Sequence, residues 1–460
     1  MLDPARIRPA NPAPVRAGGA YVLYWMTAAR RTRHNPALEH AVALSARLRL
    51  PLLVFEGLRC GYEHASARFS TFVAQGMADN AAAFKERGVT YVPWMEREAG
   101  EGREIFATLA GEAAVIVADD APLFFLPHMV AAAATRVGVR MEAVDGWGLL
   151  PVRSAGRAFG RAVDFRRHLQ RALAPHLDLL PEADPLLGYT QGPAASPVAP
   201  RVLADSGPSD VGAVALRGGQ QSARAALAGF LPRLSRYADE RSHPDADAAS
   251  GLSPYLHWGH LSAFEVLAAV APGARPTYAQ GSREGGWGGH PAESFLDELV
   301  TWRELCANTA HFLPDYTEYS SLPAWARATL DKHRHDPRQF YSLAELDEAR
   351  TDDPVWNAAQ RQLRAEGTIQ NYLRMLWGKR VLAWSATPEE AWERLVWLNN
   401  RWSIDGRDPN SWGGISWVFG RYDRPWAPER PIQGSVRYMT SASTVRKLRM
   451  RAWLARWSKA

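Results

Sequence analysis

Apolar runs alternate with amphipathic stretches over residues 19–150, and no other pattern in the chain restricts the fold as strongly. Five short apolar runs predict strands: GAYVLYWM, LPLLVFEGL, VTYVPWM, AAVIVADD and VRMEAVD. The longer stretches between them, such as PALEHAVALSARLR, have helical spacing. Continuous apolar strands separated by helices are typical of a parallel, doubly wound sheet, because such strands are buried on both faces. Residues 1–150 are therefore expected to form an α/β domain.

The pattern changes twice in the remainder of the chain. Residues 151–219 begin with a basic stretch and continue with a segment rich in Pro, Gly, Ala and Ser, which predicts a connecting segment and linker. Apolar residues then recur at three- and four-residue spacing, which predicts an all-α domain over 220–460. Helices are predicted at 221–240, 253–271, 293–313, 354–367, 368–384 and 387–402. Thr387 is the predicted N-cap of the last helix, with Glu390 three residues later, and 270–290 is a predicted loop.

Length and composition are those of a soluble globular protein with two or more domains. The chain has 460 residues, of which 47% are hydrophobic and 22% charged, enough to build large buried cores. Cys60 and Cys306 are too few for a disulfide framework or a cysteine-rich metal centre, so we expect no metal and a reducing cytoplasm. The N-terminal sequence has no apolar signal segment, and no apolar run approaches the roughly 20 residues that span a membrane.

Positive charge is concentrated at the C-terminal end. The net charge is +6, while residues 421–460 hold ten Arg or Lys and two Asp or Glu, a net of +8 for this segment. Trp453 and Trp457 are interleaved with these basic residues. A basic segment with aromatic residues favours a polyanionic partner. A solvated basic tail is the alternative.

The segment 352–417 is rich in tryptophan. Trp356, Trp377 and Trp384 are 21 and 7 residues apart, which is close to whole helical turns. Tryptophan at helical spacing usually indicates a buried core, so spacing alone leaves that alternative open. Residues 405–410, DGRDPN, then place two carboxylates, an Arg and an Asn among turn formers. These groups suit a polar heteroaromatic ligand, because they bind ring donors and acceptors directionally.

Several motifs resemble the class II branch of the photolyase/cryptochrome family. In order along the chain they are SGLSPYLHWGHLS, FLDELVTWREL, VWNAAQ, YLRMLWGKRVLAW, WLNNRW, IDGRDPNSWGGISW and ERPIQGSVRYM. The resemblance implies an antenna-type α/β domain and a helical FAD-binding domain. It also implies light-driven repair of cyclobutane pyrimidine dimers (CPDs) in DNA, in which excited reduced FAD donates an electron to a flipped-out lesion. A cryptochrome-like flavin photoreceptor without repair activity is the alternative.

The resemblance also implies which residues hold FAD. Arg374 and Asp405 would lie beside the isoalloxazine ring, and Asn399 would face its N5 atom. The residues expected to contact the cofactor are Tyr237, Ser250, Gly251, Leu252, Ser253, Glu298, Trp302, Arg374, Asn399, Asp405, Gly406, Asp408 and Asn410. Hydroxyls and N–H groups in the Ser250 segment suit phosphates, although its serines can equally cap a helix. An ordinary turn is the alternative for the Asp405 segment.

Catalysis and DNA binding follow from the same resemblance. Trp356, Trp377 and Trp384 match a relay that photoreduces FAD, and Glu298 matches a residue that hydrogen-bonds the lesion base and stabilises its radical anion. The residues expected at the lesion are Trp302, Met375, Trp417, Trp426 and Arg437. Aromatic rings suit a flipped lesion, because splayed bases stack on them. The implied partner is UV-damaged DNA, as a duplex with the lesion flipped out, bound by a monomer.

Two segments depart from the family pattern. The first predicted strand is followed by TAARRTRHNPAL, where class II relatives typically read close to SRDQR…DNWAL. This segment lies in the domain that would bind a second, antenna chromophore of the deazaflavin or folate type. Ile369, Gln370 and Asn371 stand where relatives typically have Met, His and Gly. The first departure bears on antenna binding and the second on lesion preference.

Overall fold

The chain forms two compact units, each built from three segments. A computed structural model describes residues 2–203, 209–277 and 286–458. The first unit comprises Met1–Gly156, Leu169–Leu231 and Leu252–Ala279. The second comprises Arg157–His168, Pro232–Gly251 and Gln280–Ala460. The units thus alternate along the chain, and the domain boundaries at 150 and 219 stay a prediction.

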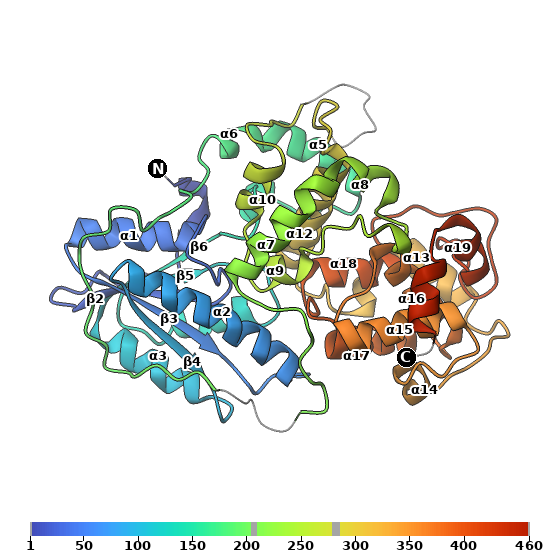
Figure 1. Ribbon diagram of the computed structural model, residues 1–460, viewed down its shortest axis with the longest axis horizontal. Coiled ribbons are helices and arrows are strands. Elements are labelled where there is room, and N and C mark those ends of the chain that lie inside the picture. The colour runs from blue at the N-terminus through green and yellow to red at the C-terminus, as the bar shows by residue number, and fades with distance from the viewer. Residues whose placement is uncertain (1, 204–208, 278–285, 459–460) are drawn as a thin grey trace. The chain divides into compact units, whose positions relative to one another are not determined.

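A six-stranded sheet forms the centre of the first unit, with strand order β1-β6-β5-β2-β3-β4 (Figure 1). The strands are β1 (Ile7–Pro9), β2 (Tyr21–Met26), β3 (Leu52–Leu58), β4 (Thr90–Met95), β5 (Ala113–Asp119) and β6 (Met141–Val144). All pairs from β2 to β6 are parallel. This arrangement confirms the predicted parallel sheet and its five strands. The sixth strand, β1, pairs antiparallel with β6. No sequence pattern predicted this strand, because it has only three residues and ends in a proline.

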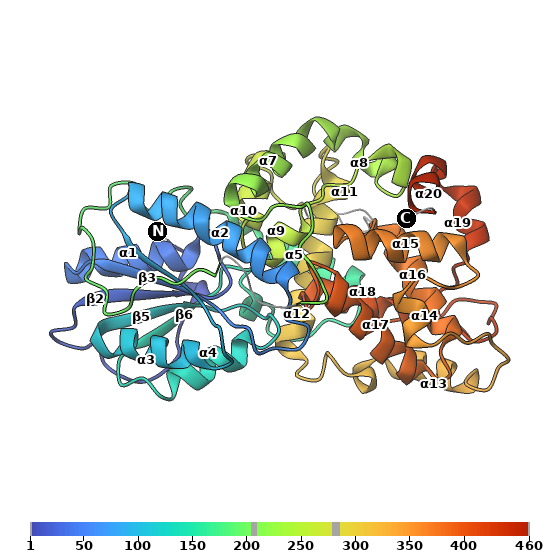
Figure 2. The ribbon, with the colours of Figure 1, turned by 60° about the horizontal axis from the view of Figure 1, so that its bottom comes forward.

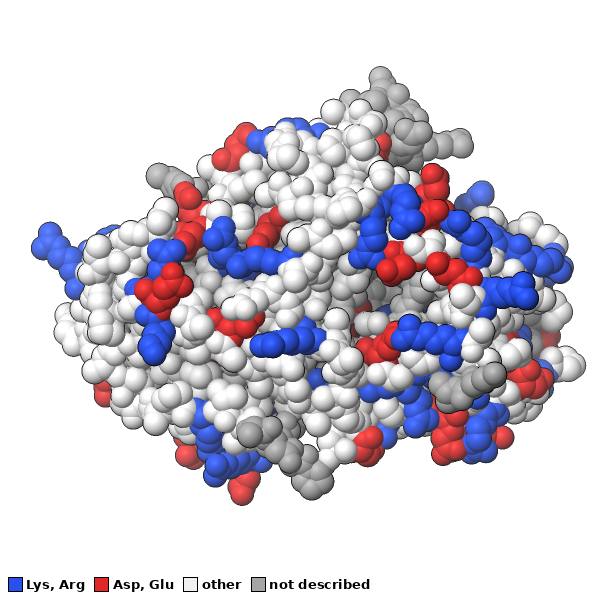
Figure 3. Space-filling model, viewed as in Figure 1, with Lys and Arg blue, Asp and Glu red and all other residues white. Residues whose placement is uncertain are grey.

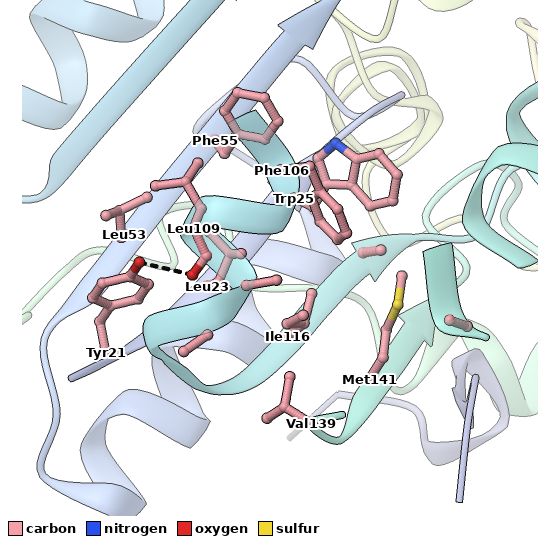
Figure 4. Close-up of a cluster of buried hydrophobic side chains, with 14 of the residues drawn as sticks. Tyr21, Leu23, Trp25, Leu53, Phe55, Phe106, Leu109, Ile116, Val139 and Met141 are labelled. Carbon is pink, nitrogen blue, oxygen red and sulfur yellow. Dashed lines mark hydrogen bonds between the residues drawn. The ribbon is translucent and has the colours of Figure 1, made fainter. Parts of the chain in front are cut away.

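Helices cover both faces of this sheet (Figure 2). They are α1 (Pro36–Leu48), α2 (Ala67–Glu86), α3 (Glu101–Glu112) and α4 (Leu126–Ala134). Alternate residues of β2 enter opposite cores, as the twofold period of a strand requires. Tyr21, Leu23 and Trp25 pack against α3 and α4, and the hydroxyl of Tyr21 donates to the carbonyl of Leu109 at 2.8 Å (Figure 4). The other face packs against α1 and α2.

The edge strand β4 is covered by part of the Pro- and Gly-rich segment. Arg201 pairs with Trp94, donates its backbone N–H to Pro93 and accepts one from Met95. Its guanidinium lies 3.9 Å from the centre of the Trp94 ring. Residues 184–203 therefore protect a sheet edge that would otherwise present unpaired backbone groups.

The second unit is helical, which confirms the predicted fold class of its region. Its helices are α8 (Leu234–Glu240), α11 (Glu293–Leu296), α12 (Arg303–Phe312), α13 (Ala324–Lys332), α14 (Leu343–Asp347), α15 (Pro354–Glu366), α16 (Asn371–Trp384), α17 (Pro388–Trp402), α18 (Pro409–Val418), α19 (Ser441–Lys447) and α20 (Arg451–Trp457). Thr387 caps α17 as predicted, accepting the N–H of Glu390 at 3.1 Å. In a capping box the Glu390 carboxylate would accept the N–H of Thr387. Here it accepts the N–H of Ala386, one residue earlier.

Two predicted helices are each divided. The segment 221–240 forms α7 (Gln220–Phe230) and α8, separated by a 3-10 turn that contains Pro232. The segment 253–271 forms α9 (Ser253–His257) and α10 (Ala263–Val270). Proline lacks the N–H that a continuous helix needs, which accounts for the first break. The predicted loop 270–290 lies partly outside the described residues.

Candidate functional site

Three buried tryptophans of the second unit form a continuous series of ring contacts. Trp356 lies on α15, while Trp377 and Trp384 lie on α16. The ring centroids of Trp356 and Trp377 are 6.4 Å apart and their planes differ by 2°. The centroids of Trp356 and Trp384 are 5.4 Å apart. Trp356 is therefore the middle member, and the two α16 rings connect through it.

The spacing of the three tryptophans suggested that their rings lie on one helical face. Instead, Trp356 belongs to a different helix from Trp377 and Trp384. Gly367 ends α15 in the left-handed region, at φ 71°, where glycine is favoured. Helix α16 packs against α15, and Trp356 is fixed when its Nε1 donates to the Trp377 carbonyl at 3.0 Å. The Nε1 of Trp377 donates to Gln360 Oε1 at 3.0 Å. Packing between helices, and not spacing along one, forms the series.

Tyr341 extends the aromatic series beyond Trp384. The two rings meet edge-on with centroids 5.0 Å apart, and the hydroxyl of Tyr341 donates to Asp352. Tyr341 is partly exposed, whereas the three tryptophans are at most 3% exposed. The contacts therefore run from the interior to the surface of this unit. An isolated tyrosine ahead of α14 has no periodic pattern, so only the packing reveals it.

A polar group forms where α16, the end of α17 and the following loop meet. The guanidinium of Arg374 donates to Asp405 at 3.3 Å and to Asn399 Oδ1 at 3.2 Å. Ser403 accepts from Arg374 at 3.3 Å and donates to Asp405 at 2.5 Å. The side chains of Arg374 and Asp405 are 16% and 12% exposed. A pair this buried adds little net stability, but its hydrogen bonds give the group a defined geometry.

The loop after this group has both structural and candidate functional residues. A Cβ at Gly406 would lie 2.9 Å from the Ser403 carbonyl oxygen, so glycine permits the close approach to α17. Asp408 caps α18 by accepting the N–H of Asn410 at 2.7 Å, and Asn410 itself is exposed. Arg374, Asn399 and Asp405 are thus brought together, while the expected cofactor contacts of Gly406, Asp408 and Asn410 stay predictions.

Glu298 lies on a π-helical segment, η5 (Asp297–Trp302), between α11 and α12. Such segments occur frequently at functional sites. Its carboxylate forms an ion pair with Arg241, the residue after α8. Burial raises the pKa of Glu298, and the charge of Arg241 opposes that shift. Trp302 is on the same segment, with its ring edge-on to Tyr422 at 6.4 Å.

Tyr237 completes the surroundings of Glu298. Its ring meets Phe295 edge-on at 5.3 Å and lies 5.3 Å from the guanidinium carbon of Arg241. Burial, with a smaller contribution from Glu298, raises the pKa of Tyr237 to about 12. Arg241 is thus a site candidate that motif reading missed. Its spacing of four residues from Tyr237, one helical turn, was the available signal.

The residues expected at the cofactor phosphates fall in different units. Ser250 and Gly251 end a segment of the second unit, and Leu252 and Ser253 begin a segment of the first. Gly251 has φ 68°, and Leu252 is the N-cap residue of α9. Their contacts with phosphate stay predictions.

Aromatic and basic side chains gather at the end of α18 and in the segment that follows it. The guanidinium carbon of Arg437 is 5.1 Å from the centre of the Trp417 ring and 4.5 Å from that of Trp426. Asp423 accepts from Nε of Arg437 at 3.2 Å and from Nε1 of Trp426 at 3.0 Å. We call Trp417, Asp423, Trp426 and Arg437 the aromatic wall. Asp423, which orients two members of it, was not predicted.

Met375 lies beside α18, the helix that carries Trp417. Its Cε would be 3.6 Å from a Cβ at Gly414, one turn before Trp417 on α18. Figure 3 shows Lys and Arg side chains over the region of α15, α16 and α19, with acidic side chains among them. Residues 286–458 thus place basic groups on the same unit as the wall.

The sequence predicts no metal site and no membrane-spanning helix, and the structure bears on both within the ranges 2–203, 209–277 and 286–458. No group of three or more His, Cys, Asp or Glu side chains there is arranged to hold a metal ion. No helix within those ranges is long and apolar enough to cross a membrane.

Known proteins resemble the whole chain. No family model matches it. A deoxyribodipyrimidine photo-lyase from Methanothermobacter thermautotrophicus is 34% identical to it, over 99% of this chain and 98% of that protein. The chain belongs to the deoxyribodipyrimidine photo-lyase family. This membership confirms the predicted enzyme class, and proteins of the same name from Oryza sativa and Potorous tridactylus are 31% and 30% identical over 98% and 92% of the chain.

Solved structures show the photo-lyase fold at lower identity. A class III photolyase from Agrobacterium tumefaciens aligns with a TM-score of 0.72 and 17% identity, over 96% of this chain and 87% of that one. A Synechocystis cryptochrome aligns with a TM-score of 0.68 and 15% identity, over 96% and 89%. Because the fold is shared by photolyases and a cryptochrome, the function has to be argued from the site.

Proposed function

We propose that this photo-lyase family member is an FAD-dependent enzyme of the class II type that repairs CPDs in DNA with light. The observation that carries the proposal is the presence, within one unit, of the aromatic wall together with the Arg374 group and the tryptophan series. A flavin photoreceptor requires the polar group and the series. It has no need of a wall on which bases stack.

The polar group fits the ring edge of a flavin. Arg374, Asn399 and Asp405 present donors and acceptors from three elements, which matches a heteroaromatic edge that carries both. The Arg374–Asp405 pair has no large uncompensated charge, so it tolerates a ring in more than one charge state. FAD, when bound and reduced, would supply the electron that splits the dimer on absorbing light.

Glu298 would hold the lesion base. Its raised pKa keeps a proton on the carboxyl group to a higher pH than usual, and a protonated carboxyl donates a hydrogen bond. Arg241 favours the carboxylate form in the protein alone. A lesion that displaced Arg241 would therefore favour the protonated, donating form of Glu298.

The aromatic wall would receive the flipped dimer. Trp417 and the 36% exposed Trp426 offer faces for stacking, and Arg437 holds both rings while presenting a positive charge to phosphate. The tryptophan series would conduct an electron inward from Trp384 through Trp356 to Trp377. Met375 and Trp302 would complete the apolar surroundings of the lesion.

A light–dark repair assay tests this function. Purified protein with reduced FAD is mixed with an oligonucleotide carrying one CPD, and restored thymines are counted by chromatography with and without blue light. Restoration that depends on light, with undamaged oligonucleotide as control, is the expected outcome. No restoration despite stoichiometric FAD would contradict the proposal.

A cryptochrome-like photoreceptor is the second candidate. The changed segment 369–371 favours it, because this segment begins α16, the helix that carries Arg374. Absence of repair with normal photoreduction of bound FAD would support this candidate over the repair enzyme.

A further inference from the structure

Lys379 on α16 is a fully buried lysine, with 0% of its surface exposed. Lysine is almost never buried to this degree without a compensating partner. Its Nζ donates to the carbonyl of Val418 at 2.5 Å. Val418 is the last residue of α18, where carbonyls lack partners within the helix and a positive charge is favourable.

The preceding glycine brings the two helices into close contact. A Cβ at Gly378 would lie 2.5 Å from Cγ2 of Val418, so a larger residue would require the Val418 side chain or its helix to shift. Gly378 and Lys379 therefore act together on the end of α18. Trp417 of the aromatic wall is the residue directly before Val418.

Lys379 also contacts the wall directly. Its Nζ is 5.4 Å from the centre of the Trp417 ring, and the guanidinium carbon of Arg437 is 5.1 Å from the same centre. Trp417 thus interacts with two cations. Such contacts become stronger when the cation is removed from water, as the Lys379 ammonium is.

Few charges compensate for the burial of this ammonium. Helix α18 presents the Trp417 ring and the Val418 carbonyl, and within residues 286–458 the charged groups acting on Lys379 are Asp423 and Arg437, none from α15 or α17. Burial lowers the pKa of Lys379 to about 7, and Asp423 favours the charged form while Arg437 opposes it. Lys379 therefore changes charge near neutral pH.

We propose that Lys379 is a positioning residue of the lesion site, which holds Trp417 through the end of α18 and strengthens the binding of damaged DNA while it is protonated. This inference rests on the proposed repair function. Loss of the proton removes one of two cations at Trp417 and weakens the attraction for an anionic partner. Binding of damaged DNA therefore weakens as the pH rises through neutrality.

The test measures binding of a fluorescent CPD oligonucleotide to the holoprotein in the dark, by anisotropy, from pH 6 to 8.5 at constant salt. The wild-type protein is expected to lose about fivefold in affinity over this range. Lys379→Met is expected to bind weakly with a flat pH profile. Lys379→Arg keeps its charge, so its affinity is expected not to fall with pH. The exposed Lys85→Met, in the first unit, serves as the matched control and keeps the wild-type profile.

Two results would overturn the inference in different ways. If Lys379→Met or Lys379→Arg shows the wild-type pH profile while CPD DNA is still preferred over undamaged DNA, Lys379 has no such role and the repair function stands. If the wild-type protein shows no preference for CPD DNA at any pH, the proposed function fails and the inference fails with it. Because Lys379→Arg retains the charge, it remains informative if Lys379→Met does not fold.

Discussion

Each unit contains a buried arginine–carboxylate pair, and the two pairs differ in how completely they are enclosed. In the first unit, Arg30 donates to Glu56 at 2.8 Å, and the side chains are 7% and 0% exposed. In the second, Arg374 and Asp405 are 3.3 Å apart, and the side chains are 16% and 12% exposed. The same chemical pair is thus more tightly enclosed in the α/β unit than in the helical one.

Neighbouring donors account for the difference. Asn80 and Tyr91 donate to the second oxygen of Glu56 at 2.9 and 2.5 Å, so both oxygens of that carboxylate are engaged. Such a satisfied network makes the fold rigid. The Arg374 group has longer contacts and retains solvent access. An ion pair is thus a better candidate site where its neighbours leave access for a ligand, as they do at Arg374 and Asp405.

The first unit, which contains the enclosed pair, is also the unit predicted to bind an antenna chromophore. Asp119, at the end of β5, accepts the N–H groups of Thr27, Ala28 and Ala29 at 2.7–2.9 Å. The segment that departs from the family pattern is therefore folded onto the sheet, and its Arg30 belongs to the enclosed pair. Binding of a deazaflavin or folate would need other groups, and it stays a prediction.

Breaking the enclosed pair should have the largest effect. Arg30→Met leaves Glu56 buried without its cation, which is expected to lower the free energy of unfolding by about 3–5 kcal/mol. Urea denaturation followed by circular dichroism measures this change. Arg374→Met is the matched variant and should cost far less stability while impairing repair. Equal stability losses in the two variants would contradict the comparison.

Lys379 should give the second unit a pH-dependent stability. The unfolded chain holds the lysine proton up to its ordinary pKa of 10.5, while burial lowers the native pKa to about 7. Between these values the unfolded state binds more protons, so stability rises with pH by up to about 1.4 kcal/mol per pH unit. Urea denaturation at pH 7, 8 and 9 measures the slope. Lys379→Met should reduce this slope. An unchanged slope in the variant would show that Lys379 does not cause the pH dependence of stability.

Glu298 should act as a protonated donor. Glu298→Ala is expected to lower the repair rate about fivefold, the size of one net hydrogen bond. Repair by the wild-type protein should fall as the pH rises through the raised pKa of Glu298. Glu298→Gln keeps a donor, so it should retain repair with a flatter pH profile. A Gln variant as impaired as the Ala variant would show that the donor is not what matters.

Gln370 offers the smallest and most specific test of the second unit. Its Oε1 accepts the N–H of Leu373 at 3.0 Å and caps α16, while its Nε2 donates to the Arg241 carbonyl at 2.5 Å. Gln370→Glu keeps the cap but loses the donor, so repair is expected to fall about threefold with little change in melting temperature.

A cap variant on a neighbouring helix serves as the control. Thr387→Ala removes the α17 cap and should cost about 1 kcal/mol of stability without changing repair by the folded protein. A loss of stability in Gln370→Glu as large as this would assign Gln370 a capping role alone.

Local patterns were enough to predict much of the fold. The strands β2–β6 have continuous apolar runs, α15, α16 and α17 have helical spacing, and the Thr387 cap has its own signature. These features depend on neighbours along the chain. The gathering of Arg374, Asn399 and Asp405 also agrees with motif reading, because their elements follow one another closely.

Contacts between separate elements were decided by the tertiary structure. Local patterns in the sequence were sufficient to predict β2–β6, α15, α16, α17 and most of the candidate site residues, because periodicity and motifs act over a few turns. Packing decided that Trp356 lies between two rings of α16, that Arg241 meets Glu298, and that Lys379 is buried. These pairings join residues 21 to 57 positions apart or depend on how closely two helices approach. Nothing in a local pattern encodes such distances, since they arise only when apolar faces pack together.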